Sequence, residues 1–396
     1  TVEGGKADFG AVIKRSRGVA DGMSKGIQFL FKKNKIDAIM GNGILKKDKK
    51  IEVTAADGTK TTYEADHIII ATGARSKELP GIAIDKKNII GYREAMSLPT
   101  MPESMVVIGA GAIGVEFAYF YHTMGTKVTV VEFMENGLVP REDAEISKEL
   151  NKIYKKKGMT ILGNTAVEKV DISGTKKKVT VKDRKTGESQ VIECDVVLSA
   201  TGVTPNLENI GLEEVGISIE KGFIKVDEFY NTSVKGYYAI GDVLPTQALA
   251  HLASAEGITC VEKIAGQHVQ PIDYGNVPGC TYCSPEVASV GYTEVAAKEA
   301  GYELKIGKFP FAASGKAAAG GVKDGFVKLI FDAKYGELLG AHFIGDNVTE
   351  MIAEVVVARK LETTGHEMIK SIHPHPTMSE AIMEAAAAAY GEVIHI

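Results

Sequence analysis

The sequence predicts an α/β fold in which two Rossmann-like units are followed by a separate α+β unit. Two buried strand patterns end in the same Ala-Thr-Gly triplet, at Ala71–Gly73 and again at Ala200–Gly202, which indicates two copies of one nucleotide-binding architecture. Glycines spaced Gly-x-Gly-x-x-Gly follow a third buried strand, at Gly109–Gly114. Beyond residue 278 the pattern changes to longer antiparallel strands that alternate with helices, which is typical of an α+β unit.

Composition excludes some classes of protein. A chain of 396 residues can hold two or three domains, and 44% hydrophobic with 24% charged residues is ordinary for a globular protein. The net charge of −5 and the scattered lysines provide no basic surface, so we expect no nucleic-acid partner. The apolar stretch 105–121 has about the length of a short membrane span. Because it contains Glu116 and the three spaced glycines, we expect a buried strand, turn and helix, and no membrane partner.

Periodicity and turn residues predict the elements in chain order. Spaced apolar residues indicate an amphipathic helix near the N-terminus, and runs of β-branched residues indicate strands. We expect helices over 12–33, from the glycine turn to 124, and over 144–157, 249–265, 294–300, 348–361 and 381–390; strands over 36–40, 50–54, 60–63, 66–73, 106–108, 127–132, 196–202, 238–242, 287–291, 326–331 and 337–344; a charged β-meander over 165–195; and a linker over 271–278.

The glycine triplet has a strand before it, a helix after it and an acid at the end of the next strand, which together predict a dinucleotide site. Gly109 allows a tight turn, Gly111 lets a pyrophosphate reach the helix N-terminus, and Gly114 permits close helix–strand packing. Glu132 would accept hydrogen bonds from ribose hydroxyls and repel a 2′-phosphate, and no arginine stands beside it. The sequence therefore predicts NAD rather than NADP. The alternative is a purely structural turn.

Asp242 follows a buried strand, at the end of a sheet where ligands bind in open α/β folds. A helix N-cap is an alternative role for this aspartate, and both roles can hold at once.

The segment His373–Glu380 places His375 ahead of Glu380, between two prolines that stiffen the chain. A carboxylate that holds a histidine fixes the imidazole tautomer and raises the basicity of a general base. The alternative is a proline-stiffened turn with surface histidines. The alanine-rich stretch that follows predicts a helix, with Thr377 or Ser379 as its N-cap.

Four cysteines are too few for a disulfide scaffold. Cys194 and Cys260 stand in apolar contexts and are expected to be buried. Cys280 and Cys283 form a CxxC that could be a redox pair or half of a zinc site. They lie on a segment that leads into a strand, where residues three apart point to opposite faces, and no second pair completes a zinc site. We expect a structural pair and no metal.

Several of these features occur in the order found in the FAD-dependent pyridine nucleotide–disulfide oxidoreductases, and the chain resembles that family over its whole length. The His-Pro-His-Pro-Thr-x-Ser-Glu form and the acid Glu132 resemble most the branch that oxidises dihydrolipoamide. The features that carry the resemblance are Ala71–Gly73, Gly109–Glu116, Gly202, Gly241-Asp242, Leu249–His251 and His373–Glu380.

The resemblance implies roles for individual residues. Glu116 would face the flavin, and His375, supported by Glu380, would be the base for a dithiol in the partner subunit's active site. NAD would contact Gly109, Gly111, Ala112, Ile113, Gly114, Glu132, Val167 and Gly202, whereas FAD would contact Gly43, Thr72, Gly73, Ala74, Asp242, Ala250 and His251.

The resemblance also implies a domain order and a set of partners. The expected protein is a homodimer that reduces NAD while it oxidises lipoyl domains of 2-oxoacid dehydrogenase or glycine cleavage complexes, in the cytoplasm or, in a eukaryote, the mitochondrial matrix. The domains would be a remainder of the FAD-binding domain over 1–100, an NAD-binding domain over 101–222, a second FAD-binding segment over 223–270 and a dimerisation domain over 271–396.

One departure from the family is large. The N-terminal glycine fingerprint for FAD, the Cys-x4-Cys disulfide and the lysine partner of Glu116 have no counterpart in this sequence. The FAD domain is therefore expected to be incomplete at its N-terminus, and the chain alone to bind FAD poorly and to lack dithiol oxidation. The alternatives are another FAD-dependent disulfide reductase or a non-catalytic NAD-binding, dimerising fragment. A glutathione-type reductase is expected to have arginines near Glu132, and a mercuric-type reductase is expected to have a C-terminal cysteine pair. The sequence has neither feature.

Overall fold

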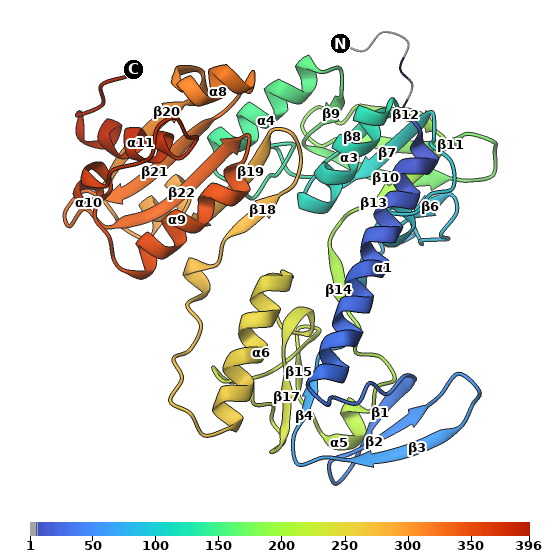
Figure 1. Ribbon diagram of the computed structural model, residues 1–396. Helices are drawn as coiled ribbons and strands as arrows, with labels where there is room; N and C mark the ends of the chain where they lie inside the picture. The colour runs from blue at the N-terminus through green and yellow to red at the C-terminus, as the bar shows by residue number, and fades with distance from the viewer. Residues whose placement is uncertain (1–4, 6) are drawn as a thin grey trace. The chain divides into compact units, whose positions relative to one another are not determined.

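The computed structural model describes residue 5 and residues 7–396 (Figure 1). The chain groups into two compact units. The first comprises 78–202, 274–396 and the described residues up to Gly10; the second comprises 11–77 and 203–273. The division falls inside the segment 1–100 that the sequence assigns to one domain.

A parallel sheet forms the first half of unit 1, with strand order β6-β13-β7-β8-β9. Its strands are nearly continuous apolar runs, as expected for a parallel sheet that is buried on both faces. The stretch 105–121 is a strand, a turn and a helix, as predicted, and the described chain contains no helix long and apolar enough to cross a membrane. The elements are β6 (Ile89–Ile90), α2 (Tyr92–Ala95), β7 (Ser104–Ile108), α3 (Ala112–Met124), β8 (Lys127–Val131), α4 (Ala144–Lys156), β9 (Thr160–Leu162) and β13 (Val196–Ser199).

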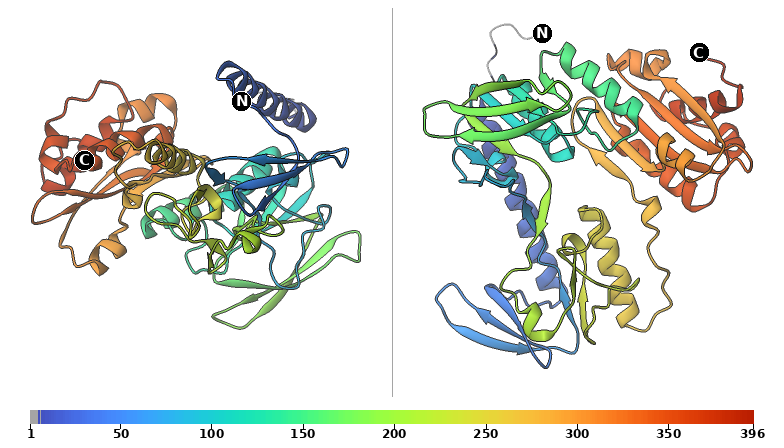
Figure 2. Two further views of the ribbon diagram at one scale, coloured as in Figure 1. Left: turned by 90° about the horizontal axis from the view of Figure 1, so that it is seen from below. Right: turned by 180° about the vertical axis from the view of Figure 1, so that it is seen from behind.

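The predicted charged meander is present as an antiparallel sheet, which Figure 2 shows as long hairpin ribbons. It consists of β10 (Thr165–Asp171), β11 (Lys177–Asp183) and β12 (Ser189–Cys194). A register shift interrupts β10 between Val167 and Lys169.

The second half of unit 1 is an antiparallel sheet in the order β18-β19-β22-β21-β20. α9 packs on β19 and β22, and α11 packs on β20 and β21 (Figure 1). Gly307 allows the close approach of α11, since a Cβ there would lie 1.8 Å from the Ala385 carbonyl oxygen. The elements are η2 (Tyr274–Asn276), β18 (Gly279–Thr281), β19 (Glu286–Gly291), α7 (Glu294–Glu299), β20 (Leu304–Pro310), η3 (Phe311–Ala313), α8 (Gly315–Gly320), β21 (Phe326–Asp332), β22 (Leu338–Gly345), α9 (Val348–Lys360), α10 (Gly365–Lys370) and α11 (Glu380–Tyr390).

Unit 2 has β4 and β17 as a parallel pair at its centre, in an apolar cluster with Cys260. A three-stranded antiparallel sheet, β1-β2-β3, and two short strand pairs complete it. The elements are β1 (Asn42–Lys46), β2 (Lys50–Thr54), β3 (Lys60–Glu64), β4 (Ile68–Ile70), β5 (Ala74–Ser76), β14 (Val203–Pro205), α5 (Leu212–Val215), β15 (Ile219–Glu220), β16 (Phe223–Ile224), β17 (Tyr237–Ala239), η1 (Gly241–Val243) and α6 (Ala250–Ile264).

Two predictions near the N-terminus need correction. The strand predicted over 36–40 is irregular chain, because the five-residue ladder with β2 begins at Asn42. The helix is confirmed as α1 (Phe9–Lys33), but Phe9 is its one buried residue and Met23 is 68% exposed. The helical spacing was therefore correct, whereas the burial that an amphipathic pattern implies is not seen.

Candidate functional site

The carboxyl ends of β7, β8 and β13 meet at one edge of the parallel sheet, and this brings the glycine turn, Glu132 and Gly202 together. The backbone N–H of Ala200 donates to the Ile108 carbonyl over 2.8 Å, which fixes the strand ends side by side. Gly109 has φ of +96°, and a Cβ there would lie 2.5 Å from the Ala200 carbonyl oxygen. A side chain at Gly109 would therefore displace the neighbouring backbone.

The start of α3 is open to an anion. Gly111 is the N-cap residue in an extended conformation, has no side-chain cap, and has no atom within 4 Å of where a Cβ would stand. Ala112 and Ile113 begin the helix, whose first backbone N–H groups have no intrahelical acceptor and carry the positive end of the helix dipole. This arrangement fits the pyrophosphate of a dinucleotide.

Glu132 is held by the turn it faces. Its side chain is buried, with Oε2 accepting from the Ala110 N–H over 2.7 Å and Oε1 accepting from the Met134 N–H over 2.8 Å. Each carboxylate oxygen keeps a further lone pair for a ribose hydroxyl. The Glu132 carbonyl accepts from the Thr165 N–H over 2.9 Å, so the start of β10, which carries Val167, joins the same edge. Glu132 therefore braces the glycine turn, a role that the sequence did not predict.

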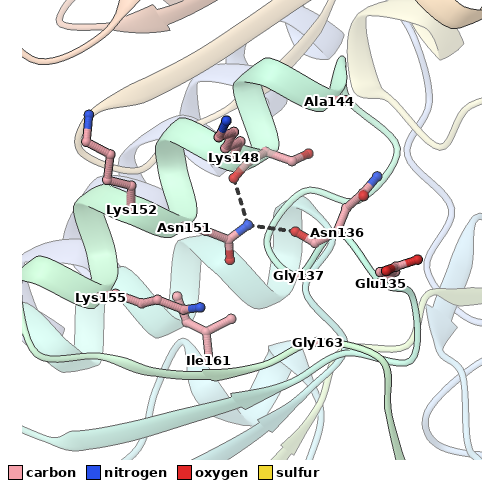
Figure 3. A pocket seen from close by; sticks show the side chains of 11 residues that line it. Glu135, Asn136, Gly137, Ala144, Lys148, Asn151, Lys152, Lys155, Ile161 and Gly163 are labelled. Carbon is pink, nitrogen blue, oxygen red and sulfur yellow. Dashed lines mark hydrogen bonds between the residues drawn. The ribbon is translucent and has the colours of Figure 1, made fainter. Parts of the chain in front are cut away.

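A cavity of about 390 Å³ lies along α4, and none of the residues lining it is a predicted site residue (Figure 3). Asn151 closes one side of it: its Nδ2 donates to the carbonyls of Asn136 over 2.6 Å and Ser147 over 2.7 Å. These bonds fix the loop after Glu132. The cavity is lined by Glu135, Asn136, Gly137, Ala144, Ser147, Lys148, Asn151, Lys152, Lys155, Ile161 and Gly163.

In unit 2 the parallel pair β4 and β17 brings two predicted turns to one edge. The Ile240 N–H donates to the Ile70 carbonyl over 3.1 Å, so the chain after β4, with Thr72 and Gly73, lies beside the chain after β17, with Asp242. The helix-cap alternative for Asp242 is wrong. Residues 241–243 form a 3₁₀ turn whose N-cap is Ile240, and α6 begins only at Ala250.

Two residues that the sequence did not single out hold these turns. Glu256 is fully buried, and its Oε2 accepts from the Gly241 N–H over 2.6 Å. Asn206 and Thr72 exchange two hydrogen bonds, of 2.8 and 3.0 Å. Glu256 could have been found, because it falls on the helix face that also carries Leu252 and Cys260, where a charge is unexpected.

The other predicted FAD residues lie in the same unit. Gly43 lies in β1, and Ala74 opens β5. Ala250 and His251 open α6, whose N-cap Leu249 provides no side-chain cap.

Glu116, on α3, is half-buried, and its Oε1 accepts from the Tyr282 N–H over 2.9 Å. Burial raises the pKa of this carboxyl, and the Tyr282 hydrogen bond opposes that rise. The sequence expects this residue to face a flavin; the contact that the structure gives it is with the segment after β18.

His375 and Glu380 are brought together as the sequence predicts. Nδ1 of His375 lies 2.9 Å from Oε1 of Glu380, and the other carboxylate oxygen accepts from the Thr377 N–H over 2.8 Å. Because a carboxylate only accepts, Nδ1 carries the proton and Nε2 keeps a lone pair for a substrate proton. Burial would raise the pKa of Glu380, but the Thr377 and His375 hydrogen bonds hold it below its usual value. Ser379 occupies the N-cap position of α11, without a side-chain cap bond.

All four cysteines are free thiols. Cys194 and Cys260 are buried, as predicted. Burial raises the pKa of Cys280 to about 11 and that of Cys283 to about 12, and Sγ of Cys283 donates to the Pro285 carbonyl. Thiols with such pKa values are poor nucleophiles at neutral pH.

Comparison with known protein families decides the class of protein. Residues 3–257 match the pyridine nucleotide-disulphide oxidoreductase family model, and residues 277–386 match the dimerisation domain of the same family. The chain belongs to the pyridine nucleotide-disulphide oxidoreductase family. This confirms the predicted α/β fold with a C-terminal dimerisation domain. The matched domains bind FAD and NAD.

Curated relatives of this oxidoreductase share much of its sequence. It is 47% identical to a dihydrolipoyl dehydrogenase of Rhizobium etli, over 98% of this chain and 84% of the relative. It is 46% identical to that of Zymomonas mobilis, over 98% of this chain and 83% of the relative. A mitochondrial dihydrolipoyl dehydrogenase of Pisum sativum is 42% identical over 98% of this chain and 77% of its own length.

The solved structures that resemble this chain include members of the same class of enzyme as the sequence relatives. LpdA of Mycobacterium tuberculosis superposes with a TM-score of 0.89 at 28% identity, over 96% of this oxidoreductase and 83% of that chain. RclA of Escherichia coli, an HOCl-induced flavoprotein disulfide reductase, has a TM-score of 0.88 at 25% identity, over 96% of this chain and 85% of its own.

Proposed function

We propose that this chain serves the NAD-linked oxidation of protein-bound dihydrolipoyl groups. The observation that carries the proposal is the His375–Glu380 pair, in which the carboxylate fixes an exposed imidazole so that Nε2 keeps a lone pair. The curated relatives, which share 41–47% of the sequence, support the choice of dithiol. When bound, FAD would supply the acceptor for the electron pair of the dithiol, and NAD would supply the final hydride acceptor.

The chain's own residues would supply proton transfer and cofactor placement. His375 Nε2 accepts a thiol proton from the dihydrolipoyl group, and the resulting imidazolium stabilises the thiolate electrostatically. Glu380 keeps the ring in the required tautomer and stabilises that cation. His375 would act in the active site of the partner subunit of a homodimer, for which the matched dimerisation domain provides support.

We assign the two sheet edges to the two cofactors. The edge in unit 1 would hold NAD, with the start of α3 against the pyrophosphate and Glu132 on the adenosine ribose. The edge in unit 2 would hold part of FAD. The NAD set is Gly109, Gly111, Ala112, Ile113, Gly114, Glu132, Val167 and Gly202; the FAD set is Gly43, Thr72, Gly73, Ala74, Asp242, Ala250 and His251, with Glu116 facing the flavin.

The proposed domains follow the same assignment: FAD-binding over 1–100 and 223–270, NAD-binding over 101–222, and dimerisation over 271–396. The proposed partners are lipoyl domains of a 2-oxoacid dehydrogenase or glycine cleavage complex. The proposed compartment is the cytoplasm, or the mitochondrial matrix if the source is a eukaryote, by analogy with the pea relative.

The test is a substrate comparison with the purified protein that carries this chain, supplied with FAD. Initial rates are measured for dihydrolipoamide with NAD, dihydrolipoamide with NADP, and glutathione disulfide with NADPH. Turnover of dihydrolipoamide with NAD, and of neither other substrate pair, supports the proposal. Turnover of glutathione disulfide would assign the chain to another reductase branch, and NAD binding without any turnover would indicate a non-catalytic role.

A further inference from the structure

A second histidine–glutamate pair, His373 with Glu354, lies next to the proposed base and has no part in the function above. The His373 side chain is 9% exposed, whereas that of His375 is 77% exposed. Glu354 belongs to α9, so this pair joins the segment before α11 to a different helix. The sequence offered His373 only as a neighbour of the proposed base.

The hydrogen bonds of His373 define its protonation state. Nδ1 lies 3.0 Å from the Ser371 carbonyl oxygen, and Nε2 lies 2.7 Å from Oε1 of Glu354. A carbonyl and a carboxylate can only accept, so both ring nitrogens must donate. A neutral imidazole has one N–H and would turn a lone pair towards one of these oxygens. The geometry is therefore that of an imidazolium.

The charges around His373 favour the same state. Glu354 faces it from α9, Glu380 faces it from α11, and His375 is its neighbour in the same segment. The hydrogen bond to Glu354 raises the pKa of His373, burial opposes the rise, and the Glu354 and Glu380 charges add to it. The His373 charge in turn helps to lower the pKa of Glu380.

We propose that His373 is a positioning residue. As an imidazolium bonded to Glu354, it ties the segment that carries His375 to α9, and it helps to keep Glu380 ionised. This rests on the proposed role of His375 as the base. The His373–Glu354 ion pair joins this segment to α9 and so helps to set where the His375 ring stands relative to that helix.

The proposal has a defined pH dependence. A group whose folded pKa is raised contributes its full stabilisation below the unfolded pKa and loses it as the pH rises through the folded pKa. The segment should therefore be fixed below the pKa of an unperturbed histidine and loosen as the pH rises through the raised pKa of folded His373.

Histidine ring signals in the purified protein, labelled with ¹³C-histidine, test the protonation state directly. His373 should titrate at a higher pH than free histidine, and Glu354→Gln should move its midpoint to lower pH. Glu350→Gln, an exposed carboxylate on the same helix, is the matched control and should leave the midpoint unchanged. An unchanged His373 midpoint in Glu354→Gln would overturn the proposal.

Kinetics then separate positioning from chemistry. His373→Gln should lower kcat with dihydrolipoamide by roughly 10-fold to 100-fold, as expected for a misplaced group, with little change in KM for NAD. His373→Arg keeps a charged double donor that does not titrate, so it should retain turnover and lose any fall in turnover that follows the titration of His373. Wild-type turnover in both Glu354→Gln and His373→Gln would contradict the proposal. If His375→Gln retains turnover, the proposed base is wrong, whereas the His373 titration still reports on the His373–Glu354 pair.

Discussion

Lys328 is 1% exposed, and its Nζ lies 2.9 Å from Oδ1 of Asp143, the N-cap residue of α4. The same ammonium lies 3.1 Å from Glu145 and 2.8 Å from Glu294. One buried cation thus joins the first turn of α4 to β21 and α7, and holds the chain that continues from the loop after Glu132. A buried charge among three carboxylates has large consequences for stability.

Removal of this cation should be costly. Lys328→Met would leave the buried Asp143 carboxylate without its partner, and we expect a loss of about 3–5 kcal/mol in the free energy of unfolding. Lys308→Met is the matched control, because Lys308 pairs with Glu145 at the surface, where ion pairs contribute about 0–1 kcal/mol. Chemical denaturation of both variants measures the difference. Equal losses would show that burial of the pair does not matter.

The same pair predicts an acid dependence of stability. Burial would raise the pKa of Asp143, but the hydrogen bond and charge of Lys328 lower it overall. A lowered folded pKa gives stability that is present above the unfolded value, about 3.9 for an aspartate, and lost as the pH falls through the folded pKa. Unfolding midpoints between neutral pH and pH 3 should therefore fall less steeply in Asp143→Asn than in the unmodified protein. A steeper fall in the variant would contradict this sign.

Two glycines of the same turn should respond differently to alanine. At Gly114 a Cβ would lie 2.0 Å from the Gly109 carbonyl oxygen, so Gly114→Ala should destabilise the fold. At Gly111 a Cβ meets no atom within 4 Å, and φ is −67°, so Gly111→Ala should fold normally. It should still weaken NAD binding, because the methyl group occupies the approach to the start of α3. Thermal unfolding and NADH titration separate the two effects; normal NADH affinity in Gly111→Ala would place the pyrophosphate elsewhere.

Glu132 should govern the choice of nucleotide. Glu132→Ala removes the acceptor for a ribose hydroxyl and the charge that repels a 2′-phosphate, so NAD should lose roughly 1.5–3 kcal/mol of binding and its advantage over NADP. Some fold stability should be lost as well, since the Ala110 and Met134 N–H groups lose their acceptor. Glu135→Ala, an exposed acid in the same loop, provides the control. Equal affinity for the two nucleotides in the unmodified protein would contradict the assignment.

The CxxC pair should be dispensable. With pKa values of about 11 and about 12, Cys280 and Cys283 are thiols at neutral pH and should react slowly with iodoacetamide. A Cys280→Ser, Cys283→Ser double variant should keep its turnover with dihydrolipoamide. If a correctly folded double variant is inactive, this pair takes part in electron transfer.

Much of the fold could be read from the sequence, because periodicity and glycine turns report on local structure. β7, the glycine turn and α3 lie where the pattern placed them. The strand predicted over 36–40 failed because strand formation depends on a partner, and the ladder with β2 begins later. β18 and β20, which the sequence did not predict, are the two edge strands of their sheet and pair only with β19 and β21.

For the candidate site residues too, contacts within one segment could be predicted, whereas contacts between distant segments could not. Local spacing was enough to bring His375 to Glu380, since both lie within one turn-and-helix segment. Contacts between distant segments, such as Glu256 with Gly241 and Glu354 with His373, follow from tertiary packing that no local pattern encodes. The sequence predicted Glu132 as a ribose acceptor, but its second role, as a brace for the glycine turn, became visible only in the structure.

The most direct test of the proposed function is the effect of His375→Gln on dihydrolipoamide oxidation by the purified, FAD-loaded protein. A base that removes a thiol proton contributes about 10²- to 10⁴-fold, so kcat should fall by that factor while NADH affinity and the unfolding midpoint stay unchanged. Glu380→Gln should cause a smaller loss, and His366→Gln, an exposed histidine on α10, should cause none. Turnover of His375→Gln equal to that of the unmodified protein would contradict the assignment of the base and of the function.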